Sequence, residues 1–294
     1  MYTKQALREL AVTVADFSDA QRQLLDDNGF FIVKGVFNAS ECDEMAAEFD
    51  RLHSAEGERG GHEVHVEPGA PRVSNIYNKT AVYDRCLAIK PLLAASAYLL
   101  GEFKLHGANL RNPAKGKGHQ DLHADVAKMF EDDWWVSNAI VTFDDMTADN
   151  GPTRVVPGSH KWQPINVPAV NRGEWQPTSP TPQEAARVPK DLAATYPGEV
   201  RVEAPRGSVI IINSSLWHGG TTNVSGKNRR VLHLTYTRRD LPQQLVQRKY
   251  LTEGLYKRMN PAQRFLMDIE KLPEGAPVSL RAAGDGHQAA SWWA

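Results

Sequence analysis

The sequence predicts a mainly β protein with flanking helices, in which an antiparallel sandwich or barrel follows an N-terminal helical layer. From about residue 102, short runs rich in β-branched and aromatic residues alternate with turns, for example "WWVSNAIVTF" and "SVIIIN". Their connections are long and irregular, which favours antiparallel strands over alternating βαβ units. Before that point, helix caps and stops dominate the pattern.

The first helix is marked by its ends in the stretch "FSDAQRQLLDDNGFFIVKGVF". Ser18 and Gln21 have the spacing of a capping box, and Gly29 is a natural helix stop. The apolar residues 30–37 that follow predict a buried strand. A second helix is expected from Ser40 through "CDEMAAEFDRLH".

Three further segments complete the organisation. Residues 54–72 are rich in Gly, Glu and Pro and predict a surface loop, whereas residues 80–100 look helical, with Pro91 at a break or in a new first turn. Residues 164–198 contain seven prolines and predict an excursion from the β core, as lids and binding loops often are. We expect a single domain over residues 1–294, divided into a helical layer (about 1–100), a β core (about 101–240) and a C-terminal extension (about 241–294).

Bulk composition excludes several classes of partner. The chain carries 34 basic and 35 acidic residues, so it lacks the basic excess typical of nucleic-acid or membrane-surface binding. The first twenty residues have no continuous apolar run, and no later run could span a bilayer. The two cysteines, Cys42 and Cys86, do not form a CxxC motif and fit a reducing compartment. We expect a cytoplasmic protein whose partner is a small-molecule substrate.

The segment "GHQDLHAD" contains two overlapping His-x-Asp pairs, His119 with Asp121 and His123 with Asp125. Such a pair is commonly half of a metal site. If the segment is a strand, all four side chains point to the same face, because successive side chains alternate. Strand geometry therefore leaves both pairs open.

A second element lies downstream in "GSVIIINSSLWHGG", where His218 follows a buried strand candidate and precedes two glycines that leave room for a ligand or metal. Two histidines and one carboxylate with open positions are the ligand set of a non-haem Fe(II) site. In the next strand candidate, Arg229 and Arg230 must point to opposite faces. A buried guanidinium needs an anion, which indicates a carboxylate-bearing co-substrate.

Other histidines are expected to be structural. His160, in "PGSH", is expected to stabilise a turn. His106 and His233, on strand candidates, are expected to be core or cavity-lining groups rather than metal ligands.

Four stretches together resemble the phytanoyl-CoA dioxygenase-like (PhyH) group of Fe(II)/2-oxoglutarate oxygenases: "LLDDNGFFIVKGVF", "QDLHAD", "FDDMTADNGPTRVVPGSH" and "WHGGTTNVSGKNRR". The resemblance implies a double-stranded β-helix (jelly-roll, cupin-like) core, with Fe(II), 2-oxoglutarate and dioxygen as cofactor and co-substrates. The family places its 2-oxoglutarate arginine eleven residues after the distal histidine, which selects Arg229.

The resemblance also bears on the ligand pair. Some members carry "HQD", which would select His119 and Asp121. Others carry "Q-x-L-H-x-D" followed by "NG-x-TR-VVPGSH", as here, so we favour His123 and Asp125, with His218 as the third ligand. Similar proteins use the residue equivalent to Gln120 to contact 2-oxoglutarate, and Thr153 is a further candidate for the same contact.

The function implied is oxidation, most simply hydroxylation, of an unactivated C–H bond in a small metabolite of natural-product or specialised metabolism. Both candidate pairs retain Asp, whereas related halogenases replace it with a small residue. Desaturation, epoxidation and ring formation stay open as outcomes. Two alternatives are a zinc-dependent hydrolase using the cluster from His119 to Asp125 and a non-catalytic jelly-roll binding protein. Specificity is expected in residues 54–72, 162–200 and the tail.

Overall fold

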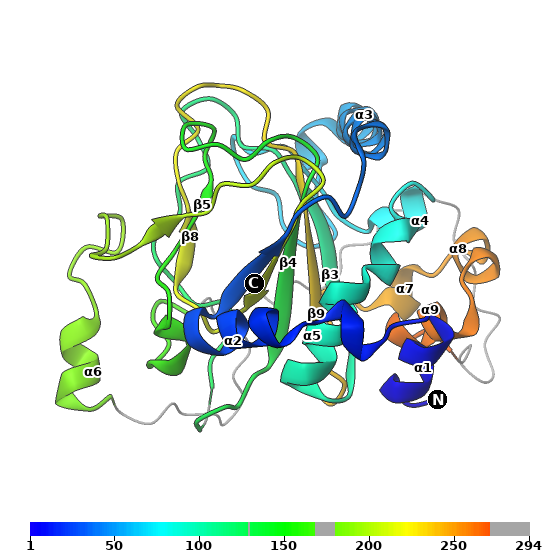
Figure 1. Ribbon diagram of the computed structural model, residues 1–294. Helices are drawn as coiled ribbons and strands as arrows, with labels where there is room; N and C mark the ends of the chain where they lie inside the picture. Colours follow the sequence, from blue (N-terminus) through cyan, green and yellow to red (C-terminus); the bar gives the residue numbers. More distant parts are fainter. Residues whose placement is uncertain (129, 168–179, 271–294) are drawn as a thin grey trace.

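Two antiparallel sheets form the centre of the protein in a computed structural model, which describes residues 1–128, 130–167 and 180–270 (Figure 1). The larger sheet has the strand order β1-β7-β4-β9-β3-β2, and the smaller has the order β6-β5-β8. The strands are β1 (Phe30–Val33), β2 (Arg72–Val73), β3 (Phe103–Arg111), β4 (Val136–Thr142), β5 (Thr153–Val155), β6 (Val200–Arg201), β7 (Val209–Asn213), β8 (His218–Gly220) and β9 (Val231–Arg238). The predicted antiparallel β core with flanking helices is confirmed.

Helices surround this core. The α-helices are α1 (Thr3–Glu9), α2 (Asp19–Asn28), α3 (Ala39–Glu56), α4 (Ile76–Lys79), α5 (Lys90–Leu100), α6 (Pro182–Arg187), α7 (Gln247–Tyr250), α8 (Glu253–Arg258) and α9 (Pro261–Leu266). Short 3-10 helices are η1 (Val14–Asp16), η2 (Gly57–Arg59), η3 (Asp84–Ala88) and η4 (Ser159–Lys161). Among the described residues, no helix is both long and apolar enough to cross a bilayer.

The helix caps act as the sequence indicates. The Ser18 side chain accepts a hydrogen bond from the main-chain N–H of Gln21, and Gly29 ends α2 in the left-handed conformation at φ 82°. This turn directs the chain into β1, which is shorter than the predicted strand and pairs with β7 at the edge of the larger sheet. Pro91 lies in the first turn of α5, where its missing N–H costs no hydrogen bond.

The larger sheet has one apolar face and one mixed face. On β4, Ala139 and Val141 belong to the main hydrophobic core, and α5 packs on this side of the sheet. The alternate residues Asn138 and Ile140 point the other way, into a cavity between the two sheets. β4 is therefore buried on both faces: one face packs in the hydrophobic core, and the other lines the cavity.

Two strand assignments differ from the sequence prediction. The larger sheet takes both its edge strands, β1 and β2, from the first hundred residues; β1 lies within a predicted strand, whereas β2 was not predicted. β2 has only two residues at the end of the predicted loop, too few to give a periodic signal. β8 was also missed, because two of its three residues are glycine. The C-terminal tail lies outside the described residues.

His160 joins the loop after β5 to the end of α2. Its Nε2 lies 3.1 Å from the main-chain oxygen of Asp26, and the residue is only 2% exposed. Its ring also closes against Gly29, where an added Cβ would approach Nδ1 to 2.7 Å. The residue is thus more than a turn former: it connects two elements far apart in the sequence.

Burial lowers the pKa of His160 from 6.5 to about 4, so the unfolded chain binds the proton more readily. The stability contributed by neutral His160 is therefore complete above about pH 6.5 and is lost as the pH falls towards 4. Between pH 7 and pH 5 we expect His160 to account for a loss of roughly 2 kcal/mol in unfolding free energy. Urea titrations of wild type and His160→Gln should show a shallower pH dependence in the variant; equal slopes would contradict this assignment.

Candidate active site

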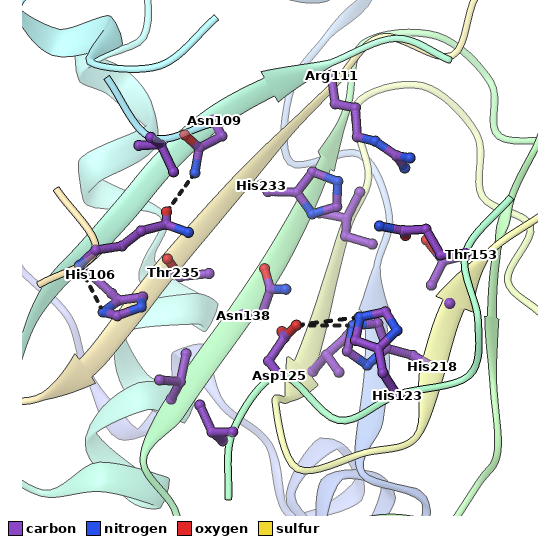
Figure 2. Close-up of a pocket in the computed structure, with 18 of the residues that line it drawn as sticks. His106, Asn109, Arg111, His123, Asp125, Asn138, Thr153, His218, His233 and Thr235 are labelled. Carbon is purple, nitrogen blue, oxygen red and sulfur yellow. Dashed lines mark hydrogen bonds and ion pairs between the residues drawn. The ribbon is translucent and has the colours of Figure 1, made fainter. Parts of the chain in front are cut away.

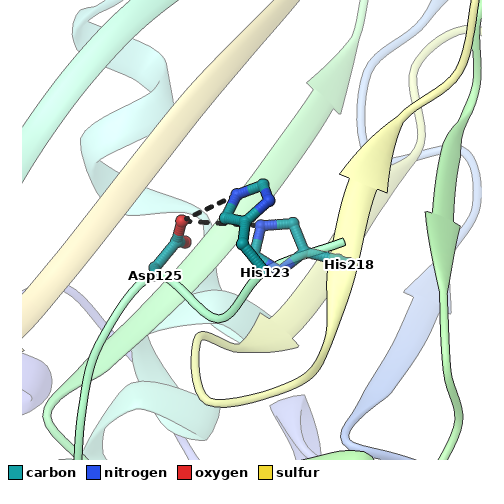
Figure 3. A group of neighbouring side chains, drawn as sticks. All are labelled: His123, Asp125 and His218. Carbon is teal, nitrogen blue, oxygen red and sulfur yellow. Dashed lines mark ion pairs between the residues drawn. The ribbon is translucent and has the colours of Figure 1, made fainter. Parts of the chain in front are cut away.

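Three side chains converge at one end of the cavity: His123, Asp125 and His218 (Figure 3). The Oδ1 atom of Asp125 lies 3.7 Å from Nε2 of His123 and 3.5 Å from Nε2 of His218. The two imidazole centroids are 4.4 Å apart, and the potential ligand atoms all lie within 4.8 Å of one another. Two imidazole nitrogens and one carboxylate oxygen thus converge with the donor types that suit Fe(II).

Main-chain carbonyls orient both imidazoles. Nδ1 of His123 lies 2.7 Å from the carbonyl oxygen of Asp121, and Nδ1 of His218 lies 2.8 Å from that of Leu216. Each Nδ1–H therefore donates to the backbone, which leaves Nε2 as the basic nitrogen facing Asp125. Metal-binding histidines are typically held in this way.

The electrostatics of the triad favour a charged carboxylate. Burial raises the pKa of Asp125, but the neighbouring His218 and His123 outweigh it and hold that pKa well below its usual value. Burial lowers the pKa of His218, whereas Asp125 raises it, and the net direction is upward. A divalent cation between the two Nε2 atoms and the charged carboxylate would be bound by all three groups, so the residues fit a bound metal.

The other His-x-Asp pair does not reach this site. His119 and Asp121 are both exposed, and neither lines the cavity. The four side chains would share one face only in a strand, and residues 119–125 are not a regular strand: only His123 makes a β bridge, to His218. The four-residue cluster required by the zinc-hydrolase alternative is not assembled.

Residues 119–125, called the ligand segment because they include His123 and Asp125, are held in register with β8 by backbone hydrogen bonds. The main-chain N–H of His123 donates to the oxygen of His218 at 2.9 Å, and the N–H of His218 donates back at 2.8 Å. Two residues further along β8, the main-chain N–H of Gln120 donates to the oxygen of Gly220 at 2.9 Å. The Gly220 N–H donates in return to the side-chain Oε1 of Gln120 at 3.1 Å. Residues nearly a hundred positions apart are thereby fixed side by side.

The two glycines after His218 also lie against neighbouring backbone, a role that was not expected. A Cβ on Gly220 would approach the carbonyl oxygen of Gly118 to 2.2 Å, and one on Gly219 would approach that of Gln120 to 2.8 Å. Their missing side chains admit the backbone of the ligand segment. Gly219 also lines the cavity, as expected of a glycine that leaves room for a ligand.

Arg154, on β5, is a buried residue for which sequence analysis assigned no role. It is 2% exposed and donates to the main-chain oxygens of Gln120 at 3.1 Å, Leu192 at 2.7 Å and Ala194 at 2.7 Å. A further contact joins it to Glu199 at 3.4 Å. Arg154 therefore ties the ligand segment to residues 192–199 of the proline-rich excursion. The position of Arg154 between Thr153 and Val155, in a short strand, is the sequence feature that could have indicated its burial.

The cavity beside the triad has a volume of about 590 Å³, within the range of small-molecule sites. Figure 2 shows Asn138 beside Asp125, with His233 and Arg111 further along the same wall. The lining residues are Val64, His65, Arg72, His106, Asn109, Arg111, Gln120, His123, Asp125, Val126, Val136, Asn138, Ile140, Thr153, Ile212, His218, Gly219, His233, Thr235 and Gln244.

This lining tests the expected contributors. Gln120 and Thr153 both line the cavity, as do His106 and His233, which were expected to be core or cavity-lining groups. Of the predicted specificity segments, residues 54–72 contribute Val64, His65 and Arg72. Among its described residues, segment 162–200 contributes none. Its described residues pack instead against residues 122–124, where Ile165 belongs to the cluster that includes Leu122.

Arg229 and Arg230 point to opposite sides, as adjacent residues at a strand end should. Arg230 forms ion pairs with Asp144 and Asp50, both at 2.7 Å. Arg229 is 1% exposed, and its three guanidinium nitrogens have no hydrogen-bond partner. Burial, together with nearby Arg111, lowers the pKa of Arg229 to about 9. An anion beside it would remove this penalty.

Comparison with known proteins is consistent with this geometry. The family model described as phytanoyl-CoA dioxygenase (PhyH) matches residues 25–231. Dioxygenase af480 of Aspergillus fumigatus is 25% identical over 231 residues, 75% of this chain, which spans 66% of that protein, just under two thirds. Ectoine dioxygenase of Bordetella bronchiseptica is 25% identical over 236 residues, 75% of this chain and 76% of that protein.

A solved structure shares the fold. HygX from Streptomyces hygroscopicus, crystallised with nickel, 2-oxoglutarate and hygromycin B, superposes with a TM-score of 0.57 at 18% identity. The match covers 77% of this chain and 90% of HygX. The predicted jelly-roll core is confirmed by this likeness and by the two antiparallel sheets.

Replacing Arg154 tests the tie between the ligand segment and the excursion. Arg154→Met leaves three carbonyls and Glu199 without their buried donor, so we expect unfolding free energy to fall by roughly 3–5 kcal/mol. Arg201→Met is the matched control, because Arg201 is the exposed cross-strand partner of Arg154. Urea unfolding and limited proteolysis at the exposed Lys190 are the measurements; equal stability and cleavage in the two variants would refute the role.

Proposed function

The chain belongs to the phytanoyl-CoA dioxygenase family, and from this membership we propose that it is an Fe(II)- and 2-oxoglutarate-dependent dioxygenase. Its substrate would be a small metabolite, oxidised at an unactivated C–H bond. The observation that carries the proposal is the convergence of His123, Asp125 and His218 on one point beside a cavity. A degenerate ligand set would favour a non-catalytic binding protein, whereas this set is complete.

The metal would be held by Nε2 of His123, a carboxylate oxygen of Asp125 and Nε2 of His218. Bound Fe(II) would supply the activation of dioxygen that couples oxidative decarboxylation of 2-oxoglutarate, to succinate and carbon dioxide, with oxidation of the substrate. The protein orients the two imidazoles through the carbonyls of Asp121 and Leu216. The retained Asp125 occupies the position that a halogenase would leave open, which supports hydroxylation.

The distal carboxylate of 2-oxoglutarate would pair with Arg229. This buried guanidinium has no partner of its own, and its fork matches a carboxylate bidentately. Gln120 is a suitable second contact, because its amide oxygen already accepts from Gly220 and its NH₂ group is left as a donor. Thr153, 6% exposed and on the cavity wall, would contact the same molecule.

The substrate would occupy the rest of the cavity. That part combines apolar side chains such as Val136 and Ile212 with neutral polar ones such as Thr235 and Gln244. A cavity of about 590 Å³ that also holds 2-oxoglutarate suits a compact metabolite. The similar protein from B. bronchiseptica is named for ectoine, a small molecule, and we place the present substrate in natural-product or specialised metabolism.

Metal binding distinguishes the two His-x-Asp pairs. In an anaerobic titration with Fe(II) and 2-oxoglutarate, wild type and His119→Ala should develop the visible metal-to-ligand charge-transfer band, because His119 is exposed and outside the cavity. His123→Ala should lose the band, because one of three ligands is removed. A band in His123→Ala but not in His119→Ala would move the site to the other pair. Absence of a band in wild type would refute the proposed function.

Replacing Arg229 should affect stability and 2-oxoglutarate affinity in opposite directions. Arg229→Met removes an unpaired buried cation, so the metal-free protein should melt at the wild-type temperature or higher. Its dissociation constant for 2-oxoglutarate should rise roughly 10- to 100-fold, because a charge-assisted bidentate pair is lost. Thermal melting and the charge-transfer titration measure the two effects.

The adjacent Arg230→Met is the matched control. It breaks ion pairs with Asp144 and Asp50, so it should lower the melting temperature and leave 2-oxoglutarate affinity unchanged. If both variants weaken 2-oxoglutarate binding equally, Arg229 has no specific role.

A further inference from the structure

Positive charge exceeds negative charge along one wall of the cavity. Arg72 and Arg111 both line it, and both bind the same carboxylate, Glu67. Nη1 of Arg72 and Nε of Arg111 each lie 2.9 Å from Oε2 of Glu67, and Nη2 of Arg111 also contacts Oε1. The two arginines are 9% and 4% exposed, respectively. One carboxylate therefore serves two buried guanidinium groups.

The described lining of the cavity offers no further acid to supply the missing charge. Among the described residues that line it, the only carboxylate is Asp125, which the two imidazoles of the triad engage. His65 and His233 are neutral at pH 7: burial, followed by the neighbouring arginines, lowers the pKa of His65 to about 4 and that of His233 well below its usual value. Nε of Arg72 is buried without a hydrogen-bond partner.

The excess is larger than 2-oxoglutarate can neutralise. Arg229, Arg72 and Arg111 bring three positive charges, and Glu67 neutralises one of them, so two positive charges remain. If one carboxylate of 2-oxoglutarate goes to the metal and the other to Arg229, one guanidinium charge is left beside the cavity. A buried unpaired cation is costly unless a ligand brings an anion to it. Planar guanidinium groups favour carboxylates for this purpose.

We propose that Arg72 and Arg111 form a second carboxylate subsite, and that the primary substrate is therefore an organic acid. The inference rests on the proposed function for the first carboxylate and for the metal. Figure 2 shows the Arg111 guanidinium on the cavity side of β3, on the same wall as His233. Glu67 lies in the segment between η2 and β2, and it both holds the two arginines in place and limits their free charge.

The test compares acids with their neutral amides. Anaerobic protein loaded with Fe(II) and 2-oxoglutarate is titrated calorimetrically with small monocarboxylates (proline, cyclohexanecarboxylate and phenylacetate) and with the carboxamide of each. We expect at least one acid to bind about tenfold or more tightly than its amide, as a charge-assisted pair predicts. Equal binding of acids and amides, or no binding of any acid, would overturn the proposal.

Two variants assign the preference to the subsite. Glu67→Gln removes the resident carboxylate and should strengthen acid binding by about tenfold. The triple variant with Gln at positions 67, 111 and 72 (Glu67→Gln, Arg111→Gln and Arg72→Gln) removes all three charges and leaves no buried cation of this cluster unpaired, so it should fold, and it should abolish the preference for acid over amide. Arg206→Gln, at a partly exposed arginine paired with Asp43, is the control and should bind like wild type. An acid preference retained in the triple variant would refute the assignment.

The same proteins separate the two sources of a carboxylate. If the subsite binds the substrate, the 2-oxoglutarate affinity of the triple variant, measured by the charge-transfer band, stays within about twofold of wild type. A tenfold loss of 2-oxoglutarate affinity without any acid preference in wild type would mean that these arginines bind the co-substrate, and would overturn the claim about the substrate. The failure of the subsite and the failure of the proposed function remain distinguishable. A missing charge-transfer band refutes the proposed function, whereas a missing acid preference refutes only the subsite. Acid titrations repeated without iron and 2-oxoglutarate measure the acid preference independently of the band.

Discussion

The backbone bridge between His123 and His218 is the contact on which the rest of the site depends. Its two hydrogen bonds, 2.9 Å and 2.8 Å long, bring a ligand on an irregular segment beside a ligand on β8. Neighbouring residues stabilise this register. Gly219 and Gly220 let the facing backbone approach closely, and Arg154 donates a hydrogen bond to the carbonyl of Gln120. The triad can then form without either histidine lying on a long strand. The geometry of the proposed metal site is therefore set by paired main chains, and the side chains supply the donor atoms.

The second constraint is electrostatic. A jelly roll needs an apolar core, and α5 and the outer face of the larger sheet provide it. The cavity side instead contains the buried guanidinium groups of Arg72 and Arg111. Arg229, which couples electrostatically to Arg111, is buried with no hydrogen-bond partner for its guanidinium nitrogens. Such groups reduce stability in the absence of ligand and favour the binding of anions. The ligand-free site therefore already has the charge that favours carboxylate binding. Part of the stability supplied by the apolar core offsets the cost of burying these guanidinium groups.

Much of this could be predicted from the sequence, and the failures have physical causes. The capping box at Ser18 and the stop at Gly29 follow from local rules that tertiary structure did not override. Alternation predicts that Arg229 and Arg230 point to opposite sides, but only the family resemblance selected Arg229, which is the buried one. The edge strand β2 and the strand β8 are too short for periodicity to show. Arg72 and Glu67 come from a segment that composition marks only as a loop. Their convergence on Arg111 of β3 depends on tertiary packing, which no local pattern encodes.

The central claim is that His123, Asp125 and His218 hold iron while Arg229 anchors 2-oxoglutarate. The most direct measurement is an anaerobic crystal structure of the protein with Fe(II) and 2-oxoglutarate. The account predicts metal bound by Nε2 of both histidines and by Asp125 at about 2.0–2.2 Å, with the distal carboxylate of 2-oxoglutarate in bidentate contact with Arg229. Metal bound through His119 or Asp121, or 2-oxoglutarate directed away from Arg229, would contradict it.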